Sequence, residues 1–189
     1  MRIALEAVGS RFESEVGYQE TLDSMVFLLY TIKKDLYMAN IYLIGSLRNP
    51  KIIEVSEKLR AAGHEVFDDW YAAGPEADDY WQKYETAKGN NYKQGLQGYA
   101  AKHVYEFDKF HLDRNDIAVL VLPAGKSGHL ELGYVIGTGK PGYILLEDPD
   151  RWDVMYQFAA GVFYSVDDLV EELDKSTRFT LEVSKKESV

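Results

Sequence analysis

The stretch VLVLPAGKSGHLELGYVIGTGKP, residues 119–141, decides the fold expected for this chain. An apolar run over residues 117–122 predicts a buried β-strand, and residues 123–128 form a turn that ends it. A helix is expected over residues 130–138, with the carboxylate of Glu131 in its first turn. In a parallel α/β sheet the loop after a strand is where ligands bind. Glu131 is therefore placed either to act on a small substrate or merely to complement the helix dipole.

Strands and helices alternate along the chain from residue 40 onward. The expected strands cover residues 41–44, 64–67, 117–122, 143–146 and 162–164, and the expected helices cover residues 50–62, 92–112, 130–138, 151–159 and 166–175. Such alternation predicts a parallel sheet that helices cover on both faces. We therefore expect an α/β fold of the flavodoxin-like, doubly wound type, with five parallel strands in the order 2-1-3-4-5.

Three parts of the chain are distinguished by their patterns. Residues 1–39 are expected to form an N-terminal helical extension, because apolar residues recur at helical spacing over residues 21–37. Residues 40–176 form the expected α/β domain, and residues 177–189 are expected to be a C-terminal tail. A polar and aromatic insertion, residues 71–89, interrupts the domain, and its Pro75 is expected to open a short helix.

The composition argues against several classes of protein and site. The chain has no cysteine, which excludes disulfides and thiolate sites, and its histidines share no metal-binding spacing. Its net charge is −10 and its basic residues are scattered, which argues against a nucleic-acid polymer as a partner. No phosphate-binding or dinucleotide-binding glycine loop is present, so no cofactor and no metal are expected. Without a secretion signal or a membrane-spanning apolar run, we expect a cytoplasmic protein with no membrane partner.

Polar residues follow the expected strands at the edge where ligands bind. Gly45, Ser46 and Arg48 follow the first strand, Asp68, Asp69 and Trp70 the second, Ser127, Gly128 and Glu131 the third, and Asp148 the fourth. This mixture suits a pocket for a polar, flat ligand that can carry a phosphate. Each residue also has a plainer interpretation: Arg48 could be a solvated charge, Asp69 a turn residue, and Asp108 a helical aspartate that faces water.

Three segments together resemble the nucleoside 2-deoxyribosyltransferase family, which includes nucleoside 5′-monophosphate N-glycosidases. They are IYLIGSLRNP at 41–50, DRNDIAVLVLP at 113–123 and SGHLELGYVIGTGKP at 127–141. The resemblance, judged also by the order of the elements, covers about residues 40–175.

The resemblance implies a role for each of three residues. The glutamate of the E-L-G motif, here Glu131, attacks the anomeric carbon of the sugar. Tyr42 in the first strand holds that glutamate. Asp108, in the helix before the third strand, contacts the base and helps to protonate it. Such chemistry needs a carboxylate beneath the cation-like sugar carbon and a second carboxyl group that supplies a proton.

The resemblance also implies a substrate-binding set. The G-S-x-R turn of Gly45, Ser46 and Arg48 matches the turn that binds the 5′-phosphate in the monophosphate-cleaving branch of the family. Ser127 could add a hydroxyl to this phosphate site. The other expected substrate-binding residues are Asp69, Trp70 and Gly128. Two features depart from the family: the long insertion at residues 71–89, and the presence of Lys126 and His129 before the glutamate.

The sequence thus predicts an enzyme of nucleotide metabolism that cleaves the N-glycosidic bond of a (deoxy)nucleoside or its 5′-monophosphate. Hydrolysis and base transfer both remain open, because they differ only in what enters the pocket second. A nucleotide sensor without catalysis and an NAD glycohydrolase are the alternatives. The expected partner is a small nucleoside or nucleotide. The resemblance also implies a homodimer or larger homo-oligomer, with which the 14 tyrosines are compatible.

Overall fold

A computed structural model of the chain describes residues 38–147, 149 and 152–175. The described residues from Ala39 onward belong to one compact unit. The helix expected over residues 21–37, the expected tail and Asp148 lie outside the described residues.

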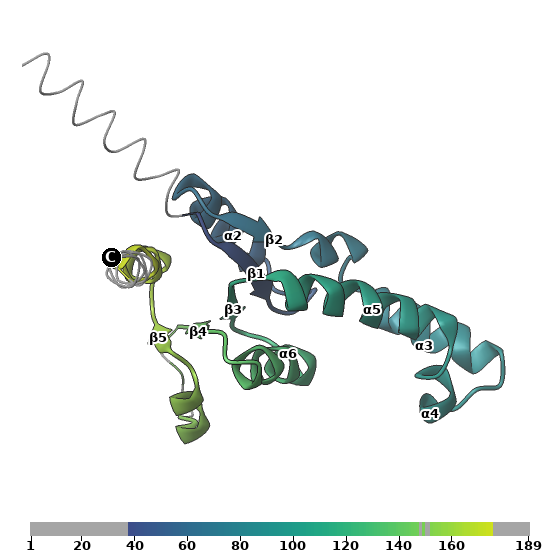
Figure 1. Ribbon diagram of the computed structural model, residues 1–189. Helices are drawn as coiled ribbons and strands as arrows, with labels where there is room; N and C mark the ends of the chain where they lie inside the picture. The colour runs from purple at the N-terminus through teal and green to yellow at the C-terminus, as the bar shows by residue number, and fades with distance from the viewer. Residues whose placement is uncertain (1–37, 148, 150–151, 176–189) are drawn as a thin grey trace, which may run out of the picture. The chain divides into compact units, whose positions relative to one another are not determined.

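Five parallel strands form one sheet in the order β2-β1-β3-β4-β5 (Figure 1). They are β1 (Asn40–Ile44), β2 (Glu65–Phe67), β3 (Ile117–Val121), β4 (Gly142–Leu145) and β5 (Gly161–Phe163). The central strands are continuous apolar runs because helices cover both of their faces, and every residue of β3 is buried. The order and the parallel pairing confirm the predicted flavodoxin-like fold.

Side chains that alternate along the strands build two separate cores. On one face, Ile41 and Leu43 pack with α2 (Lys51–Ala61) and with the helix of residues 166–175. On the other face the core contains Tyr42, Ile44, Ala118 and Leu120 of the strands, Leu112 of α5 (Tyr99–Arg114), and Leu132 and Val135 of α6 (Lys126–Gly137). The expected catalytic residues therefore belong to the face that α5 and α6 cover.

Helix α6 begins earlier than the sequence predicted. It starts at Lys126, with Gly125 as its N-cap, so Glu131 lies in its second turn rather than its first. Residues 126–128 have a composition typical of turns, so the sequence did not indicate that the helix includes them. Gly128 is buried in the helix, where an added Cβ would lie only 3.1 Å from side-chain carbons of Ile44 and Leu120. The glycine therefore allows α6 to approach the sheet closely, and a simple dipole role for Glu131 loses its basis.

The long helix expected over residues 92–112 is two helices. A short helix, α4 (Tyr92–Gly95), has a capping box formed by Asn91 and Gln94, and α5 starts afresh at Tyr99. Gly98, the N-cap of α5, has extended backbone angles, which breaks the helical path between them.

Two other helical predictions are also corrected. A 3₁₀ turn, η1 (Asp69–Ala73), leads into the insertion, which contains an eleven-residue helix, α3 (Ala77–Ala87), where Pro75 had suggested a short one. The helix expected over residues 151–159 is a 3₁₀ turn, η2 (Val154–Phe158), which the Asp153 side chain caps. No described helix combines the length and the apolar character needed to cross a membrane.

Candidate active site

Tyr42, Asp108 and Glu131 meet on the face of the sheet that α5 and α6 cover. The three groups interact: in addition to burial, the charges of Glu131 and Asp108 and a side-chain hydrogen bond with Asp108 help to raise the pKa of Tyr42, and the charge of Asp108 helps to raise that of Glu131. Asp108 lies one turn before Leu112, the buried residue of α5. Glu131 lies three residues after the buried Gly128, so it borders the buried stripe of α6. The tertiary fold thus joins three residues that lie far apart in the sequence.

Tyr42 interacts with both carboxyl groups of the site, because, in addition to burial, the charges of Glu131 and Asp108 and a side-chain hydrogen bond with Asp108 all contribute to its raised pKa. That Tyr42 holds the glutamate, as the resemblance implies, stays a prediction. Glu131 acts on the tyrosine through its charge. Tyr42 therefore lies within interaction range of both carboxyl groups.

Burial makes both carboxyl groups of the site weaker acids than usual. Loss of hydration, followed by the nearby charge of Asp108, raises the pKa of Glu131 to about 7. Burial also raises the pKa of Asp108, although the hydrogen bond from Tyr42 opposes this rise. The pKa of Tyr42 is raised by burial first and then by the two carboxylates, so its hydroxyl stays protonated. A pair of carboxyl groups in one site can thus hold a proton near neutral pH.

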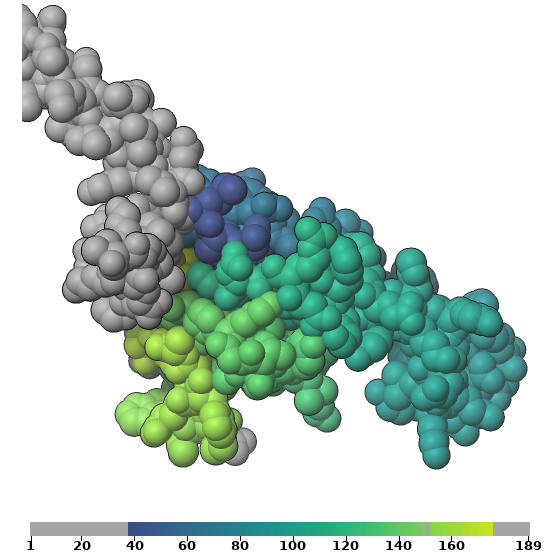
Figure 2. Space-filling view, in the orientation of Figure 1, coloured from purple at the N-terminus to yellow at the C-terminus, as the bar shows by residue number. Residues whose placement is uncertain are grey.

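A hydrogen-bonded contact joins the two helices that carry these carboxyl groups. Asp113 of α5 accepts a hydrogen bond from the Tyr134 hydroxyl of α6 at 2.5 Å and from Lys109 Nζ at 2.6 Å. The surfaces of α5 and α6 lie next to each other in Figure 2, in teal and green. This contact fixes the spacing between the helix of Asp108 and the helix of Glu131.

A chain of aromatic rings in contact leads from the buried Tyr42 to a partly exposed ring. The ring centroid of Phe67 lies 5.1 Å from that of Tyr42, and His111 stacks on Phe67 at 3.7 Å. Phe107 lies 5.7 Å from Phe67 and is 44% exposed. Phe67 could have been found by aligning parallel strands, since it pairs with Tyr42 in register. Phe107 and His111 flank Asp108 at helical spacing, a weaker signal.

Replacing Tyr42 with phenylalanine is expected to lower the rate of any reaction at this site by roughly 10- to 100-fold. The substitution removes a hydrogen bond to a charged carboxylate, which is typically worth about 1.5–3 kcal/mol. Steady-state kinetics of turnover at this site measure this effect. The matched control is Tyr143→Phe, since Tyr143 is a buried strand tyrosine on the opposite face of the sheet. An equal loss in both variants would mean that Tyr42 matters only for packing.

The turn after β1 contains the expected phosphate-binding residues. Gly45 packs closely against α2, because an added Cβ would lie 2.3 Å from Ile52 Cδ1 and would force that side chain to shift. The Ser46 Oγ accepts a hydrogen bond from the backbone N–H of Arg48 at 3.2 Å. The Arg48 guanidinium forms an ion pair with Asp79 of α3. The turn therefore has a defined shape, and its cation is held by a residue of the insertion.

The residues after β2 are placed differently from one another. The Trp70 indole N–H donates to the Leu43 backbone oxygen at 2.8 Å, and its ring packs against both cores. Asp69 is exposed at the start of η1. Its neighbour Asp68 is buried and paired with Arg60. Trp70 thus has a clear packing role, and no described contact joins Asp69 to the three catalytic candidates.

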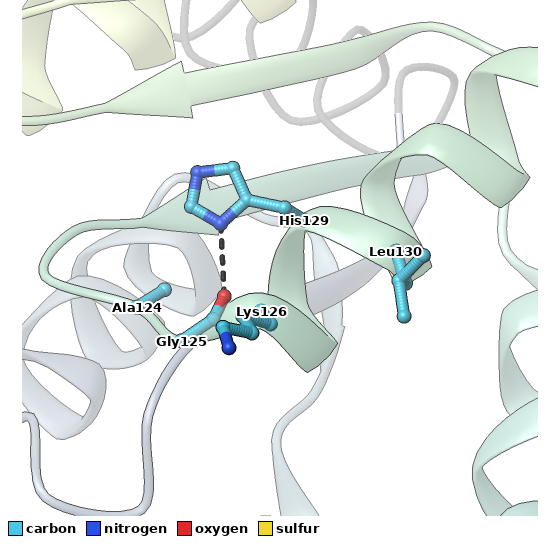
Figure 3. A pocket seen from close by; sticks show the side chains of 5 residues that line it. All are labelled: Ala124, Gly125, Lys126, His129 and Leu130. Atoms are coloured by element: carbon cyan, nitrogen blue, oxygen red, sulfur yellow. Dashed lines mark hydrogen bonds between the residues drawn. The ribbon is translucent and has the colours of Figure 1, made fainter.

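The first turn of α6 carries the remaining candidates. Ser127 is exposed there, and Gly128 packs on the end of β1. An open hollow of about 650 Å³ borders this turn and is lined by Ala124, Gly125, Lys126, His129 and Leu130 (Figure 3). His129 Nδ1 lies 2.8 Å from the Gly125 oxygen, and its Nε2 lies 3.0 Å from the Tyr156 hydroxyl. His129 thus connects the loop after β3 to η2. Across the described part of the chain, no cluster of three or more histidines and carboxylates could hold a metal.

No protein-family model and no curated protein matches this sequence. Several solved structures are similar in fold, among them the following three. A 2-deoxyribosyltransferase from Bacillus psychrosaccharolyticus aligns with 70% of this chain and 90% of its own, at 21% identity and a TM-score of 0.49. A CMP N-glycosidase from Clostridium botulinum aligns with 71% and 98%, at 12% identity and a TM-score of 0.44.

The third similar structure is a conserved protein from Enterococcus faecalis. It aligns with 74% of this chain and 99% of its own, at 16% identity and a TM-score of 0.53. The chain therefore shares its α/β fold with this conserved protein.

Proposed function

We propose that the protein cleaves the N-glycosidic bond of a (deoxy)nucleoside or its 5′-monophosphate, by hydrolysis or base transfer. One observation supports this most strongly: Glu131 and Asp108 meet beside Tyr42, and burial raises the pKa of both carboxyl groups. The motif resemblance supports the same reaction, because it assigns complementary roles to these same three residues. Two carboxyl groups with different partners are what cleavage of a glycosidic bond requires.

The proposed reaction proceeds in two displacements. The ionised Glu131 carboxylate forms a bond to C1′ while the bond from C1′ to the base nitrogen breaks, and its electron pair leaves with the base. Asp108 donates a proton to the departing base. Water, or the nitrogen of a second base, then attacks C1′, loses its proton to Asp108 and releases Glu131. Net hydrolysis consumes one water, and both carboxyl groups end as they began.

The pKa of Glu131 predicts how the rate depends on pH. Glu131 must be ionised to act as the nucleophile. Because its pKa is about 7, most of the protein carries a protonated Glu131 at pH 6. We therefore expect kcat/KM to rise as Glu131 ionises and to fall again at higher pH, where Asp108 has lost the proton that it must donate, so that the profile is bell-shaped. In Asp108→Asn the rising part of the profile should move to lower pH. The substitution removes the negative charge that, after burial, contributes most to the raised pKa of Glu131. A rate independent of pH between 5 and 8 would contradict this assignment.

The test is to incubate the protein with a panel of (deoxy)nucleosides and their 5′-monophosphates and to measure free base by chromatography. Release of a base supports the proposal, and a second base added in excess separates transfer from hydrolysis. Tight binding without release would favour a sensor. Release of nicotinamide from NAD alone would favour a glycohydrolase of that dinucleotide.

Three further expectations stay predictions. They are the division into residues 1–39, 40–176 and 177–189, the homo-oligomeric assembly and the cytoplasmic location. Light scattering of the full chain in solution would measure its oligomeric state.

A further inference from the structure

The insertion reaches back to the expected phosphate-binding turn through one ion pair. Arg48 Nη2 lies 3.0 Å from Asp79 Oδ2, although 31 residues separate them in the sequence. Arg48 belongs to the turn after β1 and Asp79 to the first turn of α3. Both side chains remain more than half exposed, at 60% and 53%. A ligand from solution can therefore reach the guanidinium and can displace the carboxylate.

A carboxylate and a phosphate compete for the same donors on an arginine. The guanidinium presents its N–H groups in a planar fork that fits either anion. Asp79 therefore occupies a position that a 5′-phosphate would need, and its charge repels a phosphate dianion nearby. Neither effect acts on a nucleoside that has no phosphate.

From this geometry we propose that Asp79 is a specificity-determining residue, which holds Arg48 and must release it before a substrate's 5′-phosphate can bind. This inference rests on the proposed function, because it takes the substrate to be a nucleoside or its 5′-monophosphate. Asp79 thus sets the balance between phosphorylated and unphosphorylated substrates at one site. The contact that the structure gives Asp79 is with Arg48, so we take it to act through that arginine.

Asp79→Asn is expected to tighten binding of a 2′-deoxynucleoside 5′-monophosphate by about 3- to 10-fold. Exposed ion pairs are weak, so the gain from freeing Arg48 is modest, and removal of a nearby negative charge adds to it. The ratio of the nucleoside Kd to the monophosphate Kd should rise by the same factor. The gain should shrink when the salt concentration rises from about 0.05 M to about 0.5 M, since salt screens exposed charges.

Calorimetric titration measures these Kd values in a Glu131→Gln background, which prevents turnover. The matched control is Asp78→Asn, an equal change of charge at the neighbouring exposed position of α3. Arg48→Gln combined with Asp79→Asn should abolish the gain. An unchanged or lower ratio in Asp79→Asn, or an equal rise in Asp78→Asn, would overturn the inference.

Base release by the protein with Glu131 intact is measured on the same two substrates. Release together with an unchanged Kd ratio contradicts only the role of Asp79. Absence of release from every nucleoside and 5′-monophosphate of the panel contradicts the proposed function itself.

Discussion

Glu131→Gln is expected to lower the rate of base release on the order of 10³-fold or more, while the protein stays folded. The amide has nearly the same shape as the carboxylate but cannot form the bond to C1′. The residue borders the buried stripe of α6 rather than the centre of a core, so the fold does not depend on its charge. Base release by chromatography and circular dichroism measure the two halves of this expectation.

The matched control for this substitution is Glu106→Gln. Glu106 is an exposed glutamate of α5, two residues from Asp108, and the same loss of charge there should leave the rate within about twofold. Glu131→Gln with full activity on every substrate that the protein cleaves would show that the nucleophile is another group.

The same substitution is expected to stabilise the protein above pH 7, on the order of 2–3 kcal/mol. The folded state raises the pKa of Glu131 from 4.5 to about 7, because burial and Asp108 disfavour its charge. Between these values the unfolded chain has released a proton that the folded protein still holds. The free energy of unfolding therefore falls as pH rises from about 4.5 to 7, and glutamine, which has no charge to bury, avoids this loss.

Urea denaturation of both proteins at pH 5 and pH 8 measures this effect. The difference in unfolding free energy should be small at pH 5 and largest at pH 8, whereas Glu106→Gln should show no comparable dependence on pH. Equal stability of Glu131→Gln and the unchanged protein at pH 8 would mean that Glu131 is not buried against Asp108. Burial of the ionised Glu131 carboxylate thus lowers the stability of the fold, as is common where a function requires a buried charge.

The sheet could be predicted from the sequence because its signals are local. Continuous apolar runs such as residues 117–121 mark buried parallel strands, and the glycine at position 63, with φ of 101°, ends α2 where the pattern indicated. Strand order followed from general rules of doubly wound sheets. Local signals and general topology rules were therefore sufficient to predict the sheet from one sequence.

Helix starts were harder to predict, because tertiary packing decides them. The Lys126-Ser127-Gly128 segment has turn composition, yet close contact of Gly128 with the sheet extends α6 through it. At Gly98 the prediction failed in the opposite sense. The apolar pattern continued across this residue and predicted one helix, whereas the chain breaks there between α4 and α5. Propensity is a weak guide where packing competes with it.

The candidate site was predictable as a set of residues and not as a set of contacts. The resemblance pointed to Tyr42, Asp108 and Glu131, and the structure adds that these three groups interact with one another. The pairing of Arg48 with Asp79 depends on the path of an insertion, which no local pattern encodes. Contacts of this kind join distant segments, so they become visible only when the fold is known.

A crystal structure of Glu131→Gln with a bound 2′-deoxynucleoside 5′-monophosphate tests the central claim most directly. The account predicts that C1′ lies about 3–3.5 Å from the side-chain oxygen at position 131, as an attacking group requires. It also predicts that Asp108 contacts the base and that the phosphate lies at Arg48. A nucleotide bound with its sugar carbon far from positions 42, 108 and 131 would contradict the account.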